Sequence, residues 1–99
     1  MGIKLKVVTP SGTFINDKEV DIVNVQTIDG DMGILVNIVP LVSALKIGTM
    51  SFRIKDKVTY VHVHRGLVVV DGKQCKIITE RLYLIDEKGK KLETPDKLF

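Results

Sequence analysis

Two histidines and a single cysteine are the side chains best suited to metal binding or nucleophilic chemistry in this chain. His62 and His64 are separated by one residue, so in a strand both imidazoles would face the same way. That spacing supplies only two ligands for a zinc ion, and Cys75 would have to approach from a neighbouring strand, with an acidic residue besides. We therefore expect no metal site. Both histidines are expected to face solvent near a loop, and Cys75 to be an ordinary strand residue.

The serines and acidic residues form no catalytic or nucleotide-binding motif. No Gly-x-Ser-x-Gly turn is present to hold a nucleophile. Asp29 and Asp31 resemble the start of a calcium loop, but the glycine and glutamate positions of an EF-hand do not follow. The glycine-rich patterns that cradle phosphates are also missing from the sequence. We expect a non-catalytic chain that takes no cofactor, metal or nucleotide.

The composition indicates one globular domain. The chain has 99 residues, of which 44% are hydrophobic and 27% are charged. Its longest uncharged run, residues 32–45, is shorter than the roughly 20 apolar residues of a membrane-spanning helix. The N-terminus shows no signal-peptide pattern. We expect no direct membrane insertion, and the single cysteine fits a reducing cytosol.

The net charge of +3 is modest, and the densest basic stretch is residues 88–91. No aromatic residues are interleaved with these basic residues in the way that nucleic-acid binding usually requires. We therefore expect no nucleic-acid partner. A free-standing basic β-barrel module for nucleic acid or acidic ligands is the alternative to the function inferred below.

Hydrophobic and polar residues alternate along most of the chain, as they do in half-buried strands. Ile3, Leu5 and Val7 alternate with lysines, and residues 48–55 and 58–64 repeat the pattern on either side of a turn. Turn signals separate these short runs, and no window has a helical period. The spacing predicts an all-β fold, an antiparallel β-sandwich or flattened barrel of about ten strands.

The most distinctive stretch is residues 29–45. It opens with Asp29-Gly30, a turn signal, and a second glycine, Gly33, follows. Because glycine admits positive φ, both glycines are interpreted as one compact bend. Pro40 cannot donate a backbone hydrogen bond and so disfavours a central strand. A segment this apolar, without a nucleophile or a ligand set, is typical of packing and loop presentation.

The order of residues in this stretch also carries a family resemblance. Residues 29–46 read Asp-Gly-Asp-Met-Gly-Ile-Leu-Val-Asn-Ile-Val-Pro-Leu-Val-Ser-Ala-Leu-Lys. The pattern resembles the amino-terminal domain of the epsilon subunit of F-type ATP synthases. Residues 5–12 are similar to the first strand and turn of that family, and residues 46–54 to the strand after the loop. The resemblance covers residues 3–85.

The resemblance implies a non-catalytic rotor subunit in the central stalk of an F-type or F-like rotary ATPase. Such a subunit binds the gamma subunit and, through the complex, the alpha/beta hexamer; the membrane rotor ring is a further expected partner. Catalysis resides on other subunits, and rotation is coupled to ATP synthesis or hydrolysis and to proton or other ion transport. The implied location is cytoplasmic, peripheral to the cell membrane.

The resemblance also implies a set of partner-facing residues. Asp31 would offer a carboxylate to basic loop residues of a ring subunit, and Ile38 an apolar contact where the family has histidine. His64 lies where the family has a small residue close to a partner-facing loop. The residues expected at the partner surface are Asp29, Gly30, Asp31, Met32, Gly33, Asn37, Ile38, Pro40, Ser43 and His64.

The sequence departs from the family in two places. Val36 and Val39 replace the usual proline and alanine, which makes the loop bulkier and is compatible with a divergent F-like ATPase that has a different partner below the stalk. Epsilon subunits also usually continue into two long helices. Here we expect a β-sandwich over residues 1–86, followed by a short tail or terminal hairpin, residues 87–99, in place of the helical pair.

Overall fold

The computed structural model describes residues 2–36 and 40–99, and within them it is all-β. This confirms the predicted fold class. No helix in the described part of the chain is long and apolar enough to cross a membrane. The ten strands are Ile3–Thr9 (β1), Gly12–Val20 (β2), Ile22–Thr27 (β3), Gly30–Ile34 (β4), Leu41–Leu45 (β5), Gly48–Ile54 (β6), Lys57–Val63 (β7), Gly66–Val70 (β8), Gln74–Thr79 (β9) and Leu82–Ile85 (β10).

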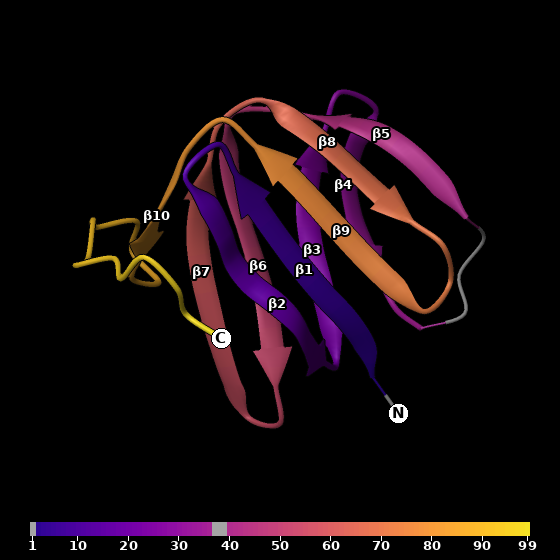
Figure 1. Cartoon of the computed structure of the whole chain (residues 1–99), viewed down its shortest axis with the longest axis horizontal. Coiled ribbons are helices and arrows are strands. Elements are labelled where there is room, and N and C mark those ends of the chain that lie inside the picture. The colour runs from indigo at the N-terminus through magenta and orange to yellow at the C-terminus, as the bar shows by residue number, and fades with distance from the viewer. Residues whose placement is uncertain (1, 37–39) are drawn as a thin grey trace.

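The strands form one sheet that curls into two facing layers (Figure 1). The first layer has the strand order β5-β8-β9-β1-β2, and the second has the order β4-β3-β6-β7-β10. The layers are joined along one side, where Thr27 of β3 pairs with Leu45 of β5. The opposite side is bordered by β2 and β10, the two end strands of the sheet.

Most neighbouring strands run antiparallel, as predicted, but β1 and β9 are parallel. Their register runs from Lys4 opposite Gln74 to Val8 opposite Ile78. The predicted fold class holds, and this pair is the exception to its antiparallel pairing. Period-two alternation is the same for either strand direction, and β1 and β9 meet only when the whole layer assembles. The sequence pattern therefore could not reveal the direction.

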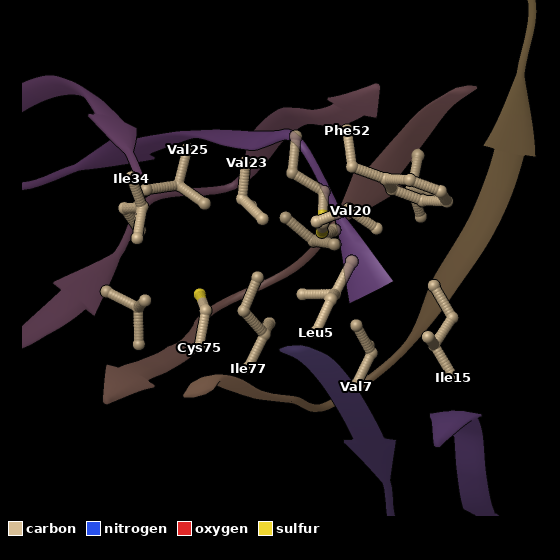
Figure 2. Close-up of a cluster of buried hydrophobic side chains, with 14 of the residues drawn as sticks. Leu5, Val7, Ile15, Val20, Val23, Val25, Ile34, Phe52, Cys75 and Ile77 are labelled. Carbon is tan, nitrogen blue, oxygen red and sulfur yellow. The ribbon is translucent and has the colours of Figure 1, made fainter. Parts of the chain in front are cut away.

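Alternate side chains of both layers point into one core. Figure 2 shows Leu5, Cys75 and Ile77 of the first layer pointing toward Val23 and Val25 of the second. All five are essentially inaccessible to solvent. Burying an aliphatic side chain of this size contributes about 1.5–3 kcal/mol. The alternation seen in the sequence thus supplies the apolar surface that holds the two layers together.

The segment that begins at Asp29 contains more strand than its glycines indicated. Gly30 has a φ of +119° and forms the turn, as expected. Gly33, however, lies within β4 and pairs with Asn24 of β3, so the interpretation of both glycines as one bend is wrong. A Cβ atom at Gly33 would lie 3.3 Å from the Asn24 Oδ1 atom. Gly33 is therefore an exposed strand residue beside which the Asn24 side chain packs closely.

A tight turn follows β10. The Asp86 carboxylate accepts hydrogen bonds from the backbone N–H groups of Lys88 and Lys90 at 2.9 and 2.8 Å. The turn allows Lys91 to pair with Ile85 in an isolated antiparallel bridge. From there the chain extends across the side of the molecule that is bordered by β10 and β2.

Cys75 is a buried residue of β9. Burial raises the pKa of its thiol to about 12, because the thiolate would lose its hydration in an apolar core. Reactive cysteines are instead partly exposed and have a lowered pKa. Cys75 is therefore a packing residue, as the sequence indicated.

We predict that alkaline pH destabilises the protein through Cys75 and that Cys75→Val reduces this effect. The unfolded thiol ionises near its ordinary pKa of 9.0, whereas the folded thiol does so only near 12. Its contribution to the free energy of unfolding is therefore complete below pH 9 and falls by about 1.4 kcal/mol per pH unit above it, until the folded thiol also ionises. Urea unfolding from pH 7 to 11 measures the loss. An equal loss in both chains would contradict a buried neutral thiol.

Candidate partner-binding surfaces

The turn between β3 and β4 presents two of the acidic residues singled out by the sequence. Thr27 is buried, and its hydroxyl donates to the Gly30 carbonyl oxygen at 2.8 Å and accepts the Asp29 N–H at 3.1 Å. Asp29 and Asp31 are exposed, and the adjoining Ile28 side chain is 68% exposed. The hydrogen bonds hold the turn in one conformation, so it is a well-defined tip that carries two carboxylates and an aliphatic side chain.

His64 lies at the same end of the molecule as this turn. Thr27 pairs with Leu45, and Leu45 pairs with Gly66, so the β3–β4 and β7–β8 connections lie near one another (Figure 1). The His64 ring meets the His62 ring edge to face, with centroids 5.3 Å apart. Within residues 2–36 and 40–99, no group of three or more His, Cys, Asp or Glu side chains could hold a metal ion.

Other predicted partner residues lie elsewhere. Pro40 precedes β5 at the strand end opposite Leu45, about 16 Å away along the strand. Met32 is half-buried and packs against the core. The Ser43 Oγ atom is buried. The side chain of the neighbouring Val42, by contrast, is exposed to solvent. Two further members of the predicted set lie outside the described residues: Asn37 and Ile38.

The sequence analysis missed an apolar surface on the outer side of the first layer. Three of its side chains have large exposed fractions, 67% for Val42, 44% for Leu67 and 39% for Ile78. Backbone pairing makes Leu67 a neighbour of Ile78. Monomeric proteins rarely expose large contiguous apolar patches, and such patches often mark interaction sites. We call this surface the aliphatic face; it consists of Val8, Val42, Ala44, Leu67, Val69 and Ile78.

The aliphatic face has a hollow and a basic border. The hollow has a volume of about 460 Å³ and lies around Gly66 and Pro10. At Gly66 the backbone of β8 lies so close to β9 that a Cβ atom would overlap the carbonyl oxygen of Ile78. Lys6 and Lys76 are paired on the adjoining part of the layer. A complementary partner would therefore be apolar at its centre and acidic where it meets Lys6 and Lys76, whereas Arg65 and Glu80 at the hollow carry opposite charges.

The sequence does contain a pattern that indicates this face, although it is not the alternation of apolar and polar residues. Residues 67–70 and 77–78 are uninterrupted aliphatic runs within strands. A strand with one face in solvent should alternate, whereas an uninterrupted run indicates a strand covered on both faces. In the chain by itself only the inner face of these strands is covered.

The outer side of the second layer is polar and aromatic. Tyr83 stacks on His62 with centroids 4.8 Å apart, and the Lys91 ammonium lies 4.9 Å from the Tyr83 ring centroid. The Asn24 side-chain amide donates to the Ser51 hydroxyl at 3.4 Å. The two outer faces of the sandwich thus differ in chemistry, and the aliphatic one is the better candidate for a permanent protein interface.

Comparison with known protein families identifies this sandwich. The family model described as ATP synthase, Delta/Epsilon chain, beta-sandwich domain matches residues 2–85. The chain belongs to this ATP synthase delta/epsilon family. The match includes all ten strands and both candidate surfaces described above.

Named relatives of this delta/epsilon-family chain agree. It is 39% identical over 77 residues to the ATP synthase epsilon chain of Alkaliphilus metalliredigens, a match covering 78% of this chain and 57% of the relative. It is 36% identical over 78 residues to the ATP synthase epsilon chain of Thermotoga petrophila, covering 79% and 71% of the two chains. The match thus spans little more than half of the Alkaliphilus chain.

Solved structures show the same fold. A chain of the Euglena gracilis mitochondrial ATP synthase superposes with a TM-score of 0.81 at 20% identity, covering 88% of this chain and 57% of that chain. A chain of the Tetrahymena thermophila mitochondrial ATP synthase superposes with a TM-score of 0.73 at 16% identity, covering 84% and 66%. At such low identity the likeness establishes the fold alone.

We predict that Gly66→Ala destabilises the chain by about 3 kcal/mol, whereas the matched change Gly33→Ala alters its stability by less than about 1 kcal/mol. At Gly66 the new methyl group would overlap the carbonyl oxygen of Ile78, which cannot move without separating β8 from β9. At Gly33 the nearest atom belongs to the exposed Asn24 side chain, which can rotate away. Urea unfolding gives both values, and equal stabilities would contradict the close approach of the two strands.

Proposed function

We propose that this chain is a non-catalytic central-stalk subunit of an F-type or F-like rotary ATPase. In this role it couples rotation to ATP synthesis or hydrolysis and to ion transport, while other subunits carry out catalysis. Its family and its named epsilon-chain relatives support the proposal. The single observation that carries it is the aliphatic face, which gives a domain of this family a surface suited to a permanent partner. The complex would hold the chain on the cytoplasmic side of the cell membrane.

In this proposal the aliphatic face binds the gamma subunit. An interface that stays assembled can be as apolar as a protein core, and burying apolar area contributes roughly 25 cal/mol per Å². Val42 and Leu67 are exposed enough to contribute to this term. Lys6 and Lys76 would meet acidic residues at the margin, which favours one orientation of the partner.

The turn between β3 and β4 would face the membrane rotor ring. Asp29 and Asp31 would pair with basic loop residues of a ring subunit, and Ile28 would add an apolar contact. His64, at the same end, would lie beside this contact. The hydrogen bonds of Thr27 hold the turn in one shape, which suits a contact that must transmit torque. Contact with the alpha/beta hexamer would come through the assembled complex.

We predict that Leu67→Asp prevents retention of the chain in the complex while leaving the isolated fold intact. Leu67 is exposed in the free chain, so the carboxylate stays hydrated there, whereas at an apolar interface it would be buried without a partner. That loss amounts to about 2–4 kcal/mol, or roughly a 30- to 1,000-fold weaker interaction. The matched change Asn24→Asp adds the same charge to the polar outer face and should leave retention unchanged.

The measurement is co-purification of the tagged chain with the alpha, beta and gamma subunits, together with the melting temperature of each free variant. Equal retention of the Leu67 and Asn24 variants would contradict the assignment of the aliphatic face to gamma. Failure of the unmodified chain to co-purify with any of these subunits would contradict the proposed function as a whole. Recovery of nucleic acid in their place would favour a free-standing basic binding module.

A further inference from the structure

The two layers are joined along β3 and β5, but they are separate along the opposite side. Among residues 2–36 and 40–99, no backbone pairing connects β2 with β10. Residues 92–99, which we call the strap, cross this opening (Figure 1, yellow). At β10 the Leu92 N–H donates to the Leu84 carbonyl oxygen at 2.8 Å, and the Leu84 N–H donates to the Thr94 hydroxyl at 2.8 Å.

The other end of the strap pairs with the edge of β2. The Leu98 N–H donates to the Phe14 carbonyl oxygen at 2.8 Å, and the Asn16 N–H donates to the Phe99 carbonyl oxygen at 3.0 Å. The Leu98 side chain packs against the core. The Phe99 ring meets the buried Phe52 ring edge to face, with centroids 6.4 Å apart. The strap thus combines strand-like pairing with two apolar side chains placed between the layers.

The strap fills only part of the opening. A groove of about 520 Å³ borders it, lined in part by Ile54, Val58 and Leu84. A second groove, of about 240 Å³, includes Pro95 of the strap in its lining. The Phe99 side chain is still 40% exposed. Apolar surface on both the strap and the layers is therefore left uncovered, and a larger ligand could bury more of it.

We propose that the opening between β2 and β10 is a binding site for an extended segment of another polypeptide, which displaces the strap. The strap itself defines the ligand chemistry, an aliphatic residue followed by an aromatic one on a backbone that pairs with Phe14 and Asn16. Addition of a strand to a free sheet edge is a common mode of peptide recognition. The Lys18 ammonium, 4.9 Å from the Phe99 ring centroid, would favour an aromatic side chain there.

Displacement would have to break the hydrogen bonds at both ends of the strap and the packing of Leu98 against the core. Each of its backbone hydrogen bonds contributes about 0.5–1.5 kcal/mol, and Pro95 in its middle has no N–H to donate. A tethered segment competes at an effective concentration on the order of millimolar. A successful ligand must therefore gain additional contacts with residues that remain when the strap leaves, such as Ile54, Val58 and Leu84 of the larger groove. The site lies at a different edge of the sheet from the aliphatic face, although its smaller groove shares Thr9 and Glu80 with the hollow of that face. It does not depend on the proposed function.

The experiment titrates the full chain with a synthetic peptide of the strap sequence and follows backbone amide signals by NMR. In the variant Leu98→Ala/Phe99→Ala the resident strap competes poorly, so the peptide should bind at least about tenfold more tightly than to the unmodified chain. The largest shifts should occur at Phe14 and Asn16 of β2. A peptide with alanine in place of its phenylalanine should bind far more weakly.

Equal affinity of the two chains for the peptide, or shifts away from β2, would overturn the proposal. If the double variant does not fold, hydrogen exchange on the unmodified chain provides the test. The Leu92 and Leu98 amides should then exchange at least about tenfold faster than the Val61 amide of β7, and equal protection would overturn a displaceable strap. A concentration-dependent dimer that exchanges straps would overturn the assignment to a different partner chain.

Discussion

Between the two layers, Leu5 and Ile77 face Val23 and Val25, and the burial of these alternating side chains is the interaction on which the architecture depends (Figure 2). Every strand contributes alternate residues to this single core, so the positions between them face outward. Those outward positions carry no packing constraint from the core. The first layer has aliphatic residues there, among them Leu67, whereas the second has polar and aromatic ones. The two outer faces can therefore serve different functions without any change to the core.

The same constraint creates the open side of the molecule. The layers are joined only where β3 meets β5, so β2 and β10 at the two ends of the sheet are each paired on one side, as is β4, which pairs only with β3. Exposed edges invite pairing with other chains, and proteins usually cover them. Here the strap pairs with β10 through Leu92 and Thr94 and with β2 through Leu98 and Phe99. The strap leaves grooves beside it. The need of the fold to cover its edges therefore coincides with the binding site that we propose at this opening.

The sequence predicted the fold well because alternation is a local property. Ile3 and Leu5 alternate with lysines and are fully buried, and Cys75 is an interior strand residue as expected. Pairing direction depends on strands distant in sequence, so the parallel β1–β9 pair was not predictable from alternation. Gly33 was misinterpreted because a glycine in the sequence can mark a close approach within a strand as well as a bend, and here the Asn24 side chain lies close to it.

The candidate partner surfaces were harder to predict. Family resemblance directed attention to neighbours in sequence, but β5 separates Pro40 from the turn at Asp31, and the Ser43 hydroxyl oxygen is buried. The aliphatic face draws its residues from strands that are far apart in the chain, including β1 and β5. In the sequence, this face is indicated by the uninterrupted aliphatic runs near Leu67 and Ile78. Such a face becomes visible once the register of the strands is known.

Hydroxyl-radical footprinting of the proposed complex tests most directly whether the aliphatic face is covered by a partner. The chain is oxidised alone and within the assembled ATPase, and mass spectrometry compares the modification of each side chain. The account predicts that oxidation of Leu67 and Ile78 falls severalfold on assembly while oxidation of Tyr83 and His62 on the other face changes little. Protection of Tyr83 and His62 with Leu67 and Ile78 still exposed would contradict it.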